Sequence, residues 1–283
     1  MKFLKHFSFA LCILVLLSNV NVYGYPNTDP NLYLGFYILD TYGKTPLPDR
    51  FRLIPSLNIS GSAQFVPSQL DNIKKAISKP DIYILDLRQE SHGFINDIAL
   101  SFFSPERLLN NGFSSQDTLA EEIKLFKKLK IDSVENIFNK RAKFIESLTV
   151  KKSSIEQDVV QDKKMNYALF ATRDGFIPTI TMTDSFVDFI KIIPENTHLH
   201  FHCDAGEGRT TMYMSMFQMM KESTSKSLEE ILKEQLDAGG IVLTDDKTRA
   251  DFLTDFYDYT KANSSSNFKM PFSIWAKSNS QTQ

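Results

Sequence analysis

Residues 199–211 have the sequence L-H-F-H-C-D-A-G-E-G-R-T-T. A short apolar and histidine-containing run ends at Cys203, five residues follow, and Arg209 then begins a second apolar segment. Because two of the five residues are glycines, the backbone can curl so that successive N–H groups point inward. Together with the N-terminus of a following helix, these amides form a cradle for an anion. The stretch therefore predicts a strand, an anion-binding loop and a helix in direct succession.

Strand and helix patterns alternate on both sides of this stretch. Buried strands are expected at residues 81–88, 165–172 and 198–203. Helices are expected at residues 68–78, 119–130, 186–193, 210–221, 227–236 and 250–259. The polar residues 151–164 are expected to form an exposed connection or a short amphipathic helix. This alternation favours an α/β fold with a central, mainly parallel sheet flanked by helices, to which the N-terminal part adds a small elaboration.

The N-terminus predicts a secretory signal peptide. Lys2 and Lys5 precede an apolar run over residues 7–17, and cleavage after Gly24 is expected. A membrane anchor is the alternative, but this run is shorter than the roughly 20 residues that span a bilayer. We therefore expect a signal peptide over residues 1–24, one domain over residues 25–283, and a secreted or periplasmic protein without a stable membrane anchor.

Composition limits the function further. The formal net charge of the 283 residues is −2, so a basic coat for nucleic acid is absent and an anionic ligand must be bound by a local patch. Signal cleavage would remove Cys12 and leave Cys203 as the single cysteine, which excludes an intramolecular disulfide. The solitary thiol is then either an inert core residue or a reactive one.

The residues around Cys203 favour a reactive thiol over a buried cysteine near a turn. The Arg209 guanidinium can close the cradle with a bidentate fork that suits a tetrahedral oxyanion. The same positive field stabilises the thiolate, which then lies at the floor of a phosphate-shaped cup as a nucleophile. Thr210 can hydrogen-bond the sulfur and help it leave. The amides expected to bind the phosphoryl group belong to Asp204, Ala205, Gly206, Glu207 and Gly208.

This pattern resembles the signature of the cysteine-dependent phosphatases, and several other segments resemble the protein-tyrosine-phosphatase-like phytases, which are bacterial inositol polyphosphate phosphatases. These segments are L-P-D-R-F-R (47–52), D-L-R-Q-E-S-H-G-F-I-N (86–96), A-G-G (238–240) and P-F-S-I-W-A-K (271–277). The resemblance covers about residues 45–278. It implies a protein-tyrosine-phosphatase-like fold and phosphomonoester hydrolysis through a phosphocysteine intermediate, on myo-inositol phosphates, without metal or other cofactor. Phosphotyrosyl proteins or phosphoinositides are the alternative substrates, and a non-catalytic phosphate-binding module is the alternative class.

The reaction also needs a general acid, for which T-R-D-G-F-I-P (172–178) is the candidate loop. Asp174 lies four residues before the proline, as in the Thr-Asp-His-x-x-Pro loop of the family. Gly175 replaces the histidine of that loop, and Arg173 can supply the positive charge instead. Asp184 is the competing acid, but it is better suited to the start of the next helix.

The resemblance carries over several further residues. His202 is expected to orient the loop, and Arg52, Asp86, His92 and Lys247 are expected to bind substrate. His92 packing in the core and Arg88 bracing the loop with Glu90 are the structural alternatives. His198, His200 and His202 share one strand face and could hold zinc, but structural hydrogen bonding is the preferred interpretation and no metal is expected.

Two departures from the family argue for fewer contacts to phosphate. Glu207 would repel a polyanion if its side chain faced inward, and the segment after Gly240 offers only Lys247 and Arg249. A less phosphorylated inositol, a phosphoinositide head group or phosphotyrosine would need fewer cations.

Overall fold

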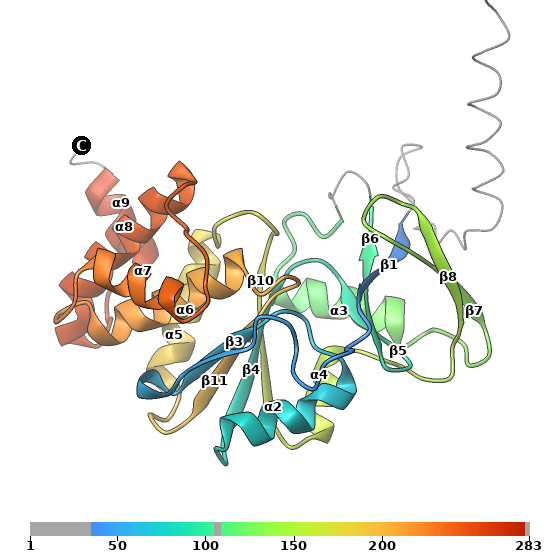
Figure 1. The fold of residues 1–283 in the computed structure, drawn as a ribbon. Coiled ribbons are helices and arrows are strands. Elements are labelled where there is room, and N and C mark those ends of the chain that lie inside the picture. The colour runs from blue at the N-terminus through green and yellow to red at the C-terminus, as the bar shows by residue number, and fades with distance from the viewer. Residues whose placement is uncertain (1–34, 105–108, 281–283) are drawn as a thin grey trace, which may run out of the picture.

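The computed structural model describes residues 35–104 and 109–280, so the predicted signal peptide lies outside the described residues. A five-stranded central sheet has the order β10-β4-β11-β3-β2 (Figure 1). Its strands are β2 (Arg52–Ile54), β3 (Ile59–Ser62), β4 (Ile82–Arg88), β10 (Asn166–Thr172) and β11 (His198–His202). All neighbouring pairs are parallel except β2 and β3. The predicted mainly parallel sheet is therefore confirmed, and β11 lies at its middle.

Helices cover both faces of the central sheet (Figure 1). They are α2 (Leu70–Ile77), α3 (Ser115–Phe126), α4 (Glu156–Asp162), α5 (Ile180–Ile192), α6 (Gly208–Glu222), α7 (Leu228–Asp237), α8 (Lys247–Asn263) and α9 (Phe272–Ser280), with 3-10 turns at η1 (Pro55–Leu57), η2 (Pro67–Gln69) and η3 (Ser264–Ser266). Alternate residues of β4 serve two cores. Ile82 and Ile84 pack with α2 and α4, whereas Leu85 and Leu87 pack with α5, α6 and α8. This is why β4 is a nearly continuous apolar run.

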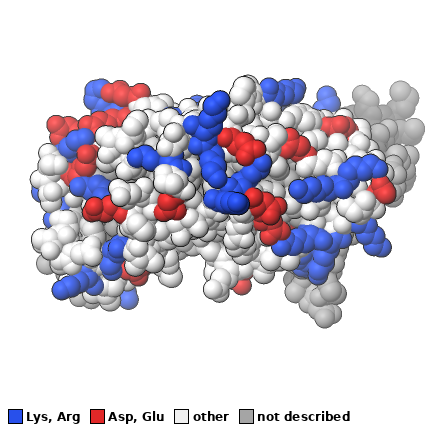
Figure 2. Space-filling view, turned by 90° about the horizontal axis from the view of Figure 1, so that it is seen from below, with Lys and Arg blue, Asp and Glu red and all other residues white. Residues whose placement is uncertain are grey.

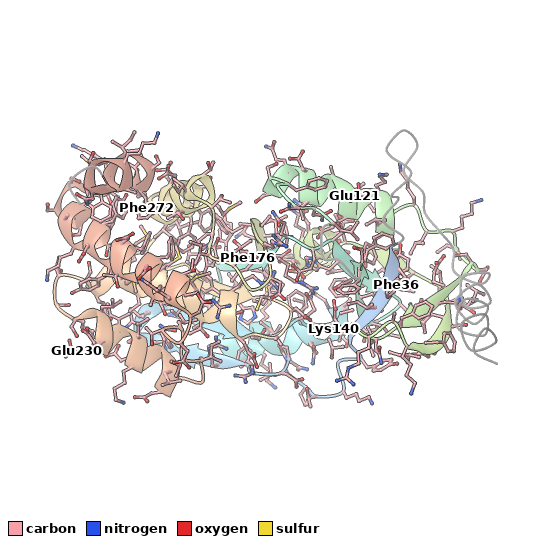
Figure 3. The ribbon with its side chains drawn as sticks, turned by 90° about the horizontal axis from the view of Figure 1, so that it is seen from above. Phe36, Glu121, Lys140, Phe176, Glu230 and Phe272 are labelled. Carbon is pink, nitrogen blue, oxygen red and sulfur yellow. The ribbon has the colours of Figure 1, made fainter. Side chains whose placement is uncertain are left out.

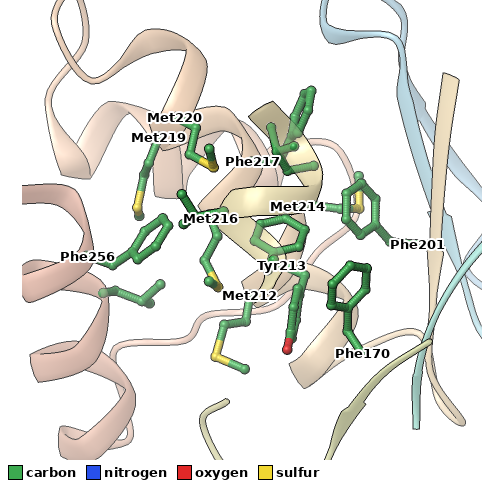
Figure 4. Packing of buried hydrophobic residues seen from close by; sticks show 14 of the residues in the cluster. Phe170, Phe201, Met212, Tyr213, Met214, Met216, Phe217, Met219, Met220 and Phe256 are labelled. Carbon is green, nitrogen blue, oxygen red and sulfur yellow. The ribbon is translucent and has the colours of Figure 1, made fainter. Parts of the chain in front are cut away.

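Helix α6 passes through the larger core (Figure 4). Met212, Met214, Met216, Met219 and Met220 are all buried among aromatic rings, as the sequence predicted for core methionines. A helix that is buried on every side cannot move without repacking its neighbours. The N-terminus of α6, which follows the cysteine loop, is therefore held rigidly.

A second, six-stranded sheet, here called the side sheet, has the order β8-β7-β1-β6-β5-β9. Its strands are β1 (Phe36–Thr41), β5 (His92–Ile95), β6 (Ile98–Phe103), β7 (Val134–Phe138), β8 (Phe144–Thr149) and β9 (Ser153–Ser154). Only β1 precedes the central sheet in sequence, and the other five strands lie between β4 and β10. The expected N-terminal elaboration is thus mostly an insertion, and it is larger than predicted.

Helix starts account for most of the differences from the predicted boundaries. Ser114 accepts a hydrogen bond from the Asp117 amide, so α3 begins four residues earlier than expected. Thr179 caps α5 in the same way, so α5 begins six residues earlier than expected. Residues 151–164 form β9 and α4, and the buried side chains of Glu156, Val159 and Val160 exclude an exposed connection.

The surface carries both signs of charge. In the face shown in Figure 2, Lys and Arg are interspersed with Asp and Glu, and basic side chains gather near the middle. Among the described residues, none of the helices has the length and apolar character needed to cross a membrane.

Candidate active site

The loop of residues 203–209, here called the phosphate loop, connects β11 to α6. The Cys203 side chain is buried at the start of the loop, and the Thr210 hydroxyl donates to its Sγ over 3.1 Å. Gly206 has a φ of +70°, and a Cβ at this position would lie 2.5 Å from the backbone nitrogen of Ala63. Only glycine fits both constraints, so the curled backbone expected from the sequence is present.

Arg209 is held by groups at the carboxyl ends of two neighbouring strands, β4 and β10. Its guanidinium donates to both carboxylate oxygens of Glu90 over 2.7 and 2.8 Å and to the Thr172 carbonyl over 3.0 Å. Burial alone would raise the pKa of Glu90, but Arg209 and Arg88 outweigh burial and hold this pKa well below its ordinary range. Burial would lower the pKa of Arg209, yet Glu90 raises it, so the guanidinium remains charged.

The structure brings Asp174 to the phosphate loop and places Asp184 elsewhere. The Asp174 Oδ1 lies 3.2 Å from the Arg209 Nη2, and its side chain is 60% exposed. Asp184 instead accepts a hydrogen bond from the backbone amide of Ser273 at the start of α9. Of the two candidate acids, only Asp174 is within reach of a phosphoryl group held by Arg209.

A pocket lies between the two sheets and reaches the phosphate loop at Asp204. Charged side chains from both sheets line it: Arg88, Glu90, Lys140, Arg173, Asp174 and Asp204. Phe102, Phe103, Leu109 and Phe176 form its apolar wall. Figure 3 shows Phe176 and Lys140 near the middle of the molecule, between the helices that carry Glu230 and Phe272 and the side sheet that carries Phe36. The pocket therefore combines a polar floor with a partly apolar rim.

Lys140 is a pocket residue that sequence reasoning missed. It lies in the turn between β7 and β8, and its ammonium forms an ion pair with the Asp204 carboxylate. No local motif marks this turn as part of a site, because only the fold of the side sheet brings it to the phosphate loop. The N-K-R-A-K run at 139–143 was the one available signal.

The Glu207 side chain points away from the pocket. Its carboxylate pairs with the Arg50 guanidinium at 2.8 Å, and both side chains are partly exposed. The repulsion considered from the sequence therefore does not arise. Ala205 is exposed on the outer side of the loop, and Gly208 lies beneath the side chain of Arg249.

Arg52 extends from β2 to the phosphate loop, but its side chain is buried and does not line the pocket. Its guanidinium donates to the Gly206 carbonyl over 2.9 Å and to the Thr211 hydroxyl over 3.3 Å. Burial lowers the pKa of Arg52 to about 10, which leaves it charged at neutral pH. The A-G-G segment packs on the same side chain, because a Cβ on Gly239 would lie 3.6 Å from the Arg52 Cδ.

The structure does not bring Lys247 into the pocket. Its ammonium pairs with the Asp251 carboxylate one turn along α8, at 2.7 Å, and the side chain is 85% exposed. Two residues further on, Arg249 donates from Nη2 to the Gly175 carbonyl over 3.2 Å. Arg249, rather than Lys247, is therefore the α8 cation beside the candidate site.

Asp86 on β4 and His92 on β5 are both buried in a network of charged side chains. The structure therefore does not place either side chain where it would contact a substrate. The His92 imidazole lies 2.9 Å from a Glu122 carboxylate oxygen and 3.1 Å from an Asp86 oxygen. Burial would lower the pKa of His92, but Asp86 and Glu122 raise it well above its ordinary value. His202 pairs with Glu156 at 2.6 Å in the same network.

Two overlapping groups in this network have ligand atoms within 4.8 Å of one another and could in principle hold a metal ion. They are Asp86, His92 and Glu122, and Asp86, Glu156 and His202. A charged His92 among these carboxylates already supplies the balancing positive charge.

The other two strand histidines form hydrogen bonds with serines of β3. The Ser60 Oγ lies 2.8 Å from the His198 Nε2 and 2.8 Å from the His200 Nδ1. The Ser62 Oγ lies 3.1 Å from the His200 Nε2 and donates to the Ala63 carbonyl over 2.7 Å. Burial lowers the pKa of His198 to about 4 and that of His200 well below its ordinary value. These contacts agree with the structural interpretation of the histidines.

Fold and site together define the class: a protein-tyrosine-phosphatase-like α/β domain with a Cys-x5-Arg phosphate loop. A model of the PTP-like phytase family, whose description names inositol hexakisphosphate, matches residues 85–221. The chain is therefore similar to the PTP-like phytases in sequence over these residues and in fold over most of its length.

Three known proteins illustrate the similarity. The effector protein hopD2 of Pseudomonas syringae pv. tomato is 27% identical over 251 residues, which cover 81% of this chain and 54% of that protein. A tandemly repeated protein tyrosine phosphatase like phytase from Mitsuokella multacida is 28% identical with a TM-score of 0.78, covering 89% of this chain and 50% of that one. A PTP-like phytase from Bdellovibrio bacteriovorus is 28% identical with a TM-score of 0.74, covering 89% and 96%.

A second Mitsuokella structure, of a PTP-like myo-inositol phosphatase, contains myo-inositol-(1,3,4,5)-tetrakisphosphate and matches with the same identity, coverage and TM-score. The chain spans about half the length of hopD2 and of the Mitsuokella protein, and nearly the full length of the Bdellovibrio enzyme.

Proposed function

We propose that the protein is a cysteine-dependent phosphomonoester hydrolase. One observation carries this proposal: the Arg209 guanidinium, fixed by Glu90 and the Thr172 carbonyl, lies beside the Cys203 loop and within 3.2 Å of Asp174. A phosphoryl group held by Arg209 and the loop amides would meet a nucleophile on one side and a carboxyl group on the other. No metal ion or cofactor is required by this arrangement.

In the first step the Cys203 thiolate attacks phosphorus while the bond from phosphorus to the ester oxygen breaks. Asp174 gives its proton to the leaving alkoxide, and the phosphoryl group remains on sulfur. Arg209 and the loop amides stabilise the extra negative charge of the transition state.

In the second step Asp174, now a carboxylate, removes a proton from water, and the resulting oxygen nucleophile attacks the phosphocysteine. Inorganic phosphate leaves and the thiolate is restored, stabilised by the Thr210 hydroxyl that already donates to Sγ. Thr210 thus helps sulfur to act as a leaving group.

The proposed substrates are myo-inositol phosphates. Support comes from the inositol hexakisphosphate family model and from the Mitsuokella relative in complex with an inositol tetrakisphosphate. The rim of the pocket offers Lys140 and Arg173 to further phosphates, with Arg249 close by, and Glu207 points away. These few cations favour a substrate with a small number of phosphates engaged at once. We also propose a bacterial protein exported by its N-terminal segment, acting in the periplasm or outside the cell.

The test compares phosphate release by the mature protein and by Cys203→Ser, with a chelator present throughout. The substrates are inositol hexakisphosphate, less phosphorylated inositols, phosphoinositides and a phosphotyrosine peptide. Release from inositol phosphates that is lost in the variant is expected, and acid quenching should trap one phosphoryl group on Cys203 by mass spectrometry. Release only from the peptide or the lipid would move the enzyme to the alternative substrate class. Absence of release from every substrate would overturn the proposal in favour of a phosphate-binding module.

A further inference from the structure

The loop that carries Asp174, residues 173–177, has little buried surface to hold it in place. Asp174 is 60% exposed, Phe176 is 52% exposed, and no atom lies within 4 Å of where a Cβ on Gly175 would be. Within the loop, the Phe176 amide donates to the Arg173 carbonyl, and the Arg173 guanidinium lies over the Phe176 ring. A segment of this kind opens at low free-energy cost unless specific contacts hold it.

Arg249 makes such a contact from another part of the fold. Its Nη2 donates to the Gly175 carbonyl over 3.2 Å. The same guanidinium lies over the phosphate loop, where its atoms are 3.6 to 3.9 Å from the position of a Cβ on Gly208. One side chain therefore links the loop of the candidate acid to the loop of the candidate nucleophile.

The backbone of Arg249 is well anchored. Its amide donates to the Asp246 carboxylate over 2.9 Å, at the first turn of α8. On the same helix, Phe252, Leu253 and Phe256 are buried in the larger core against α6, which itself begins at the phosphate loop. The guanidinium thus extends from a rigid helix to the middle of a loop whose other contacts include the Asp174–Arg209 pair and the packing of Ile177 against the larger core.

We propose that Arg249 is a positioning residue that holds the loop of residues 173–177 closed over the phosphate loop, so that Asp174 stays within proton-transfer distance of the leaving group. The inference rests on the phosphatase activity proposed above. Because the contact is to a backbone carbonyl and not to a substrate phosphate, its loss should affect proton transfer and leave phosphate binding largely intact. A single charge-assisted hydrogen bond of this kind corresponds to about a tenfold change in the closed population.

The kinetic test compares Arg249→Ala with Lys261→Ala, which removes one positive charge from the far end of the same helix. Each is assayed on an inositol phosphate, whose alkoxide needs a proton to leave, and on an aryl phosphate with an acidic phenol, which needs the proton less. Arg249→Ala should lower kcat about tenfold on the inositol phosphate, with little change in KM and a smaller loss on the aryl phosphate. Arg249→Lys, which keeps a donor, should recover part of the loss.

Two further results separate a positioning role from other roles. Adding Arg249→Ala to Asp174→Asn should cause no further loss on the inositol phosphate, because the positioned group is already absent. Amide hydrogen exchange at Phe176, measured without substrate, should be several-fold faster in Arg249→Ala than in Lys261→Ala.

Equal losses on both substrates, or additive losses with Asp174→Asn, would overturn the proposal and assign Arg249 to substrate binding. Unchanged exchange at Phe176 would overturn it as well. If the unmodified protein released no phosphate, the proposed function would fail, but the exchange measurement would still decide whether Arg249 holds the loop.

Discussion

The central sheet and the side sheet differ in how the chain builds them and in what they give to the pocket. In the central sheet, β11 is followed by the phosphate loop, β10 by the loop of Asp174, and β4 by Glu90. The groups proposed to do the chemistry therefore lie together at the carboxyl ends of parallel strands. The side sheet collects strands from two separate regions of the chain and gives the pocket Lys140 and an apolar wall. The groups proposed to do the chemistry thus come from the central sheet, whereas the side sheet contributes only to the lining of the pocket, so changes in one half should leave the contribution of the other measurable.

The largest kinetic effect within this comparison is expected for Asp174→Asn in the central half. Loss of a positioned general acid should lower kcat on an inositol phosphate by about 10²- to 10⁴-fold. The loss should be smaller on an aryl phosphate with an acidic phenol. A steady-state comparison of the two substrates checks this, and Asp184→Asn is the matched control, since that carboxylate binds the Ser273 amide.

Glu90→Gln should reduce the free energy of unfolding by about 3 kcal/mol, because it leaves the buried Arg209 without its bidentate partner. The folded-state pKa of Glu90 is lowered, so its stabilisation is complete above the unfolded value of about 4.3 and is lost as pH falls through the folded value. Urea unfolding at several pH values should show the gap between the two proteins closing in acid. A gap that stayed constant from neutral pH to strongly acidic pH would contradict the assignment.

Lys140→Ala tests the contribution of the side sheet. Loss of this cation should raise KM for an inositol phosphate about tenfold through a missing contact to a second phosphate, with kcat nearly unchanged. A simple aryl phosphate has no second anionic group, so its KM should hardly change. Equal changes in KM on both substrates would mean that Lys140 acts through Asp204 on the phosphate loop. The side sheet would then contribute to the chemistry as well as to substrate binding.

The smallest effect is expected for Glu207→Gln, although this residue lies in the phosphate loop itself. Its exposed pair with Arg50 contributes at most about 1 kcal/mol to the free energy of unfolding. The free energy of unfolding should therefore change by no more than this amount, and kcat and KM by less than about fivefold. A large fall in KM for inositol phosphates would show that the carboxylate turns inward when substrate binds.

The two halves also differ in how far sequence could predict them. The Cys203 loop, the strands beside it and the Asp174 loop are contiguous segments whose chemistry is local, and the structure places all of them near the predicted boundaries. The turn at Asn96 and Asp97 joins β5 to β6 with a left-handed Asn96, φ 59°, and this signal of a hairpin was overlooked. Lys140 could not be found in this way, and Arg249 could not be chosen over Lys247, because their place in the site depends on how distant elements pack.

Asp86 and His92 were predicted to bind substrate, but the structure places both in the core. Their segment resembles the family closely, yet resemblance alone does not tell whether a side chain faces the pocket or the core. The pairing of His92 with Glu122 and Asp86 depends on α3 and β4 meeting, which no local pattern specifies.

The serine and histidine contacts between β3 and β11 have a consequence for where each proton lies. Ser62 gives its hydroxyl proton to the Ala63 carbonyl, so its oxygen must accept the proton of the His200 Nε2. His200 is neutral, hence its Nδ1 is bare and accepts from Ser60, whose oxygen in turn accepts from the His198 Nε2. Both imidazoles are thereby fixed as the same tautomer in a one-way chain that ends next to the phosphate loop. Both ring nitrogens of His200 are used in this chain, so adding a proton or a zinc ion to His200 would require the chain to break or reverse. His200 therefore supports the site structurally and does not take part in its titration.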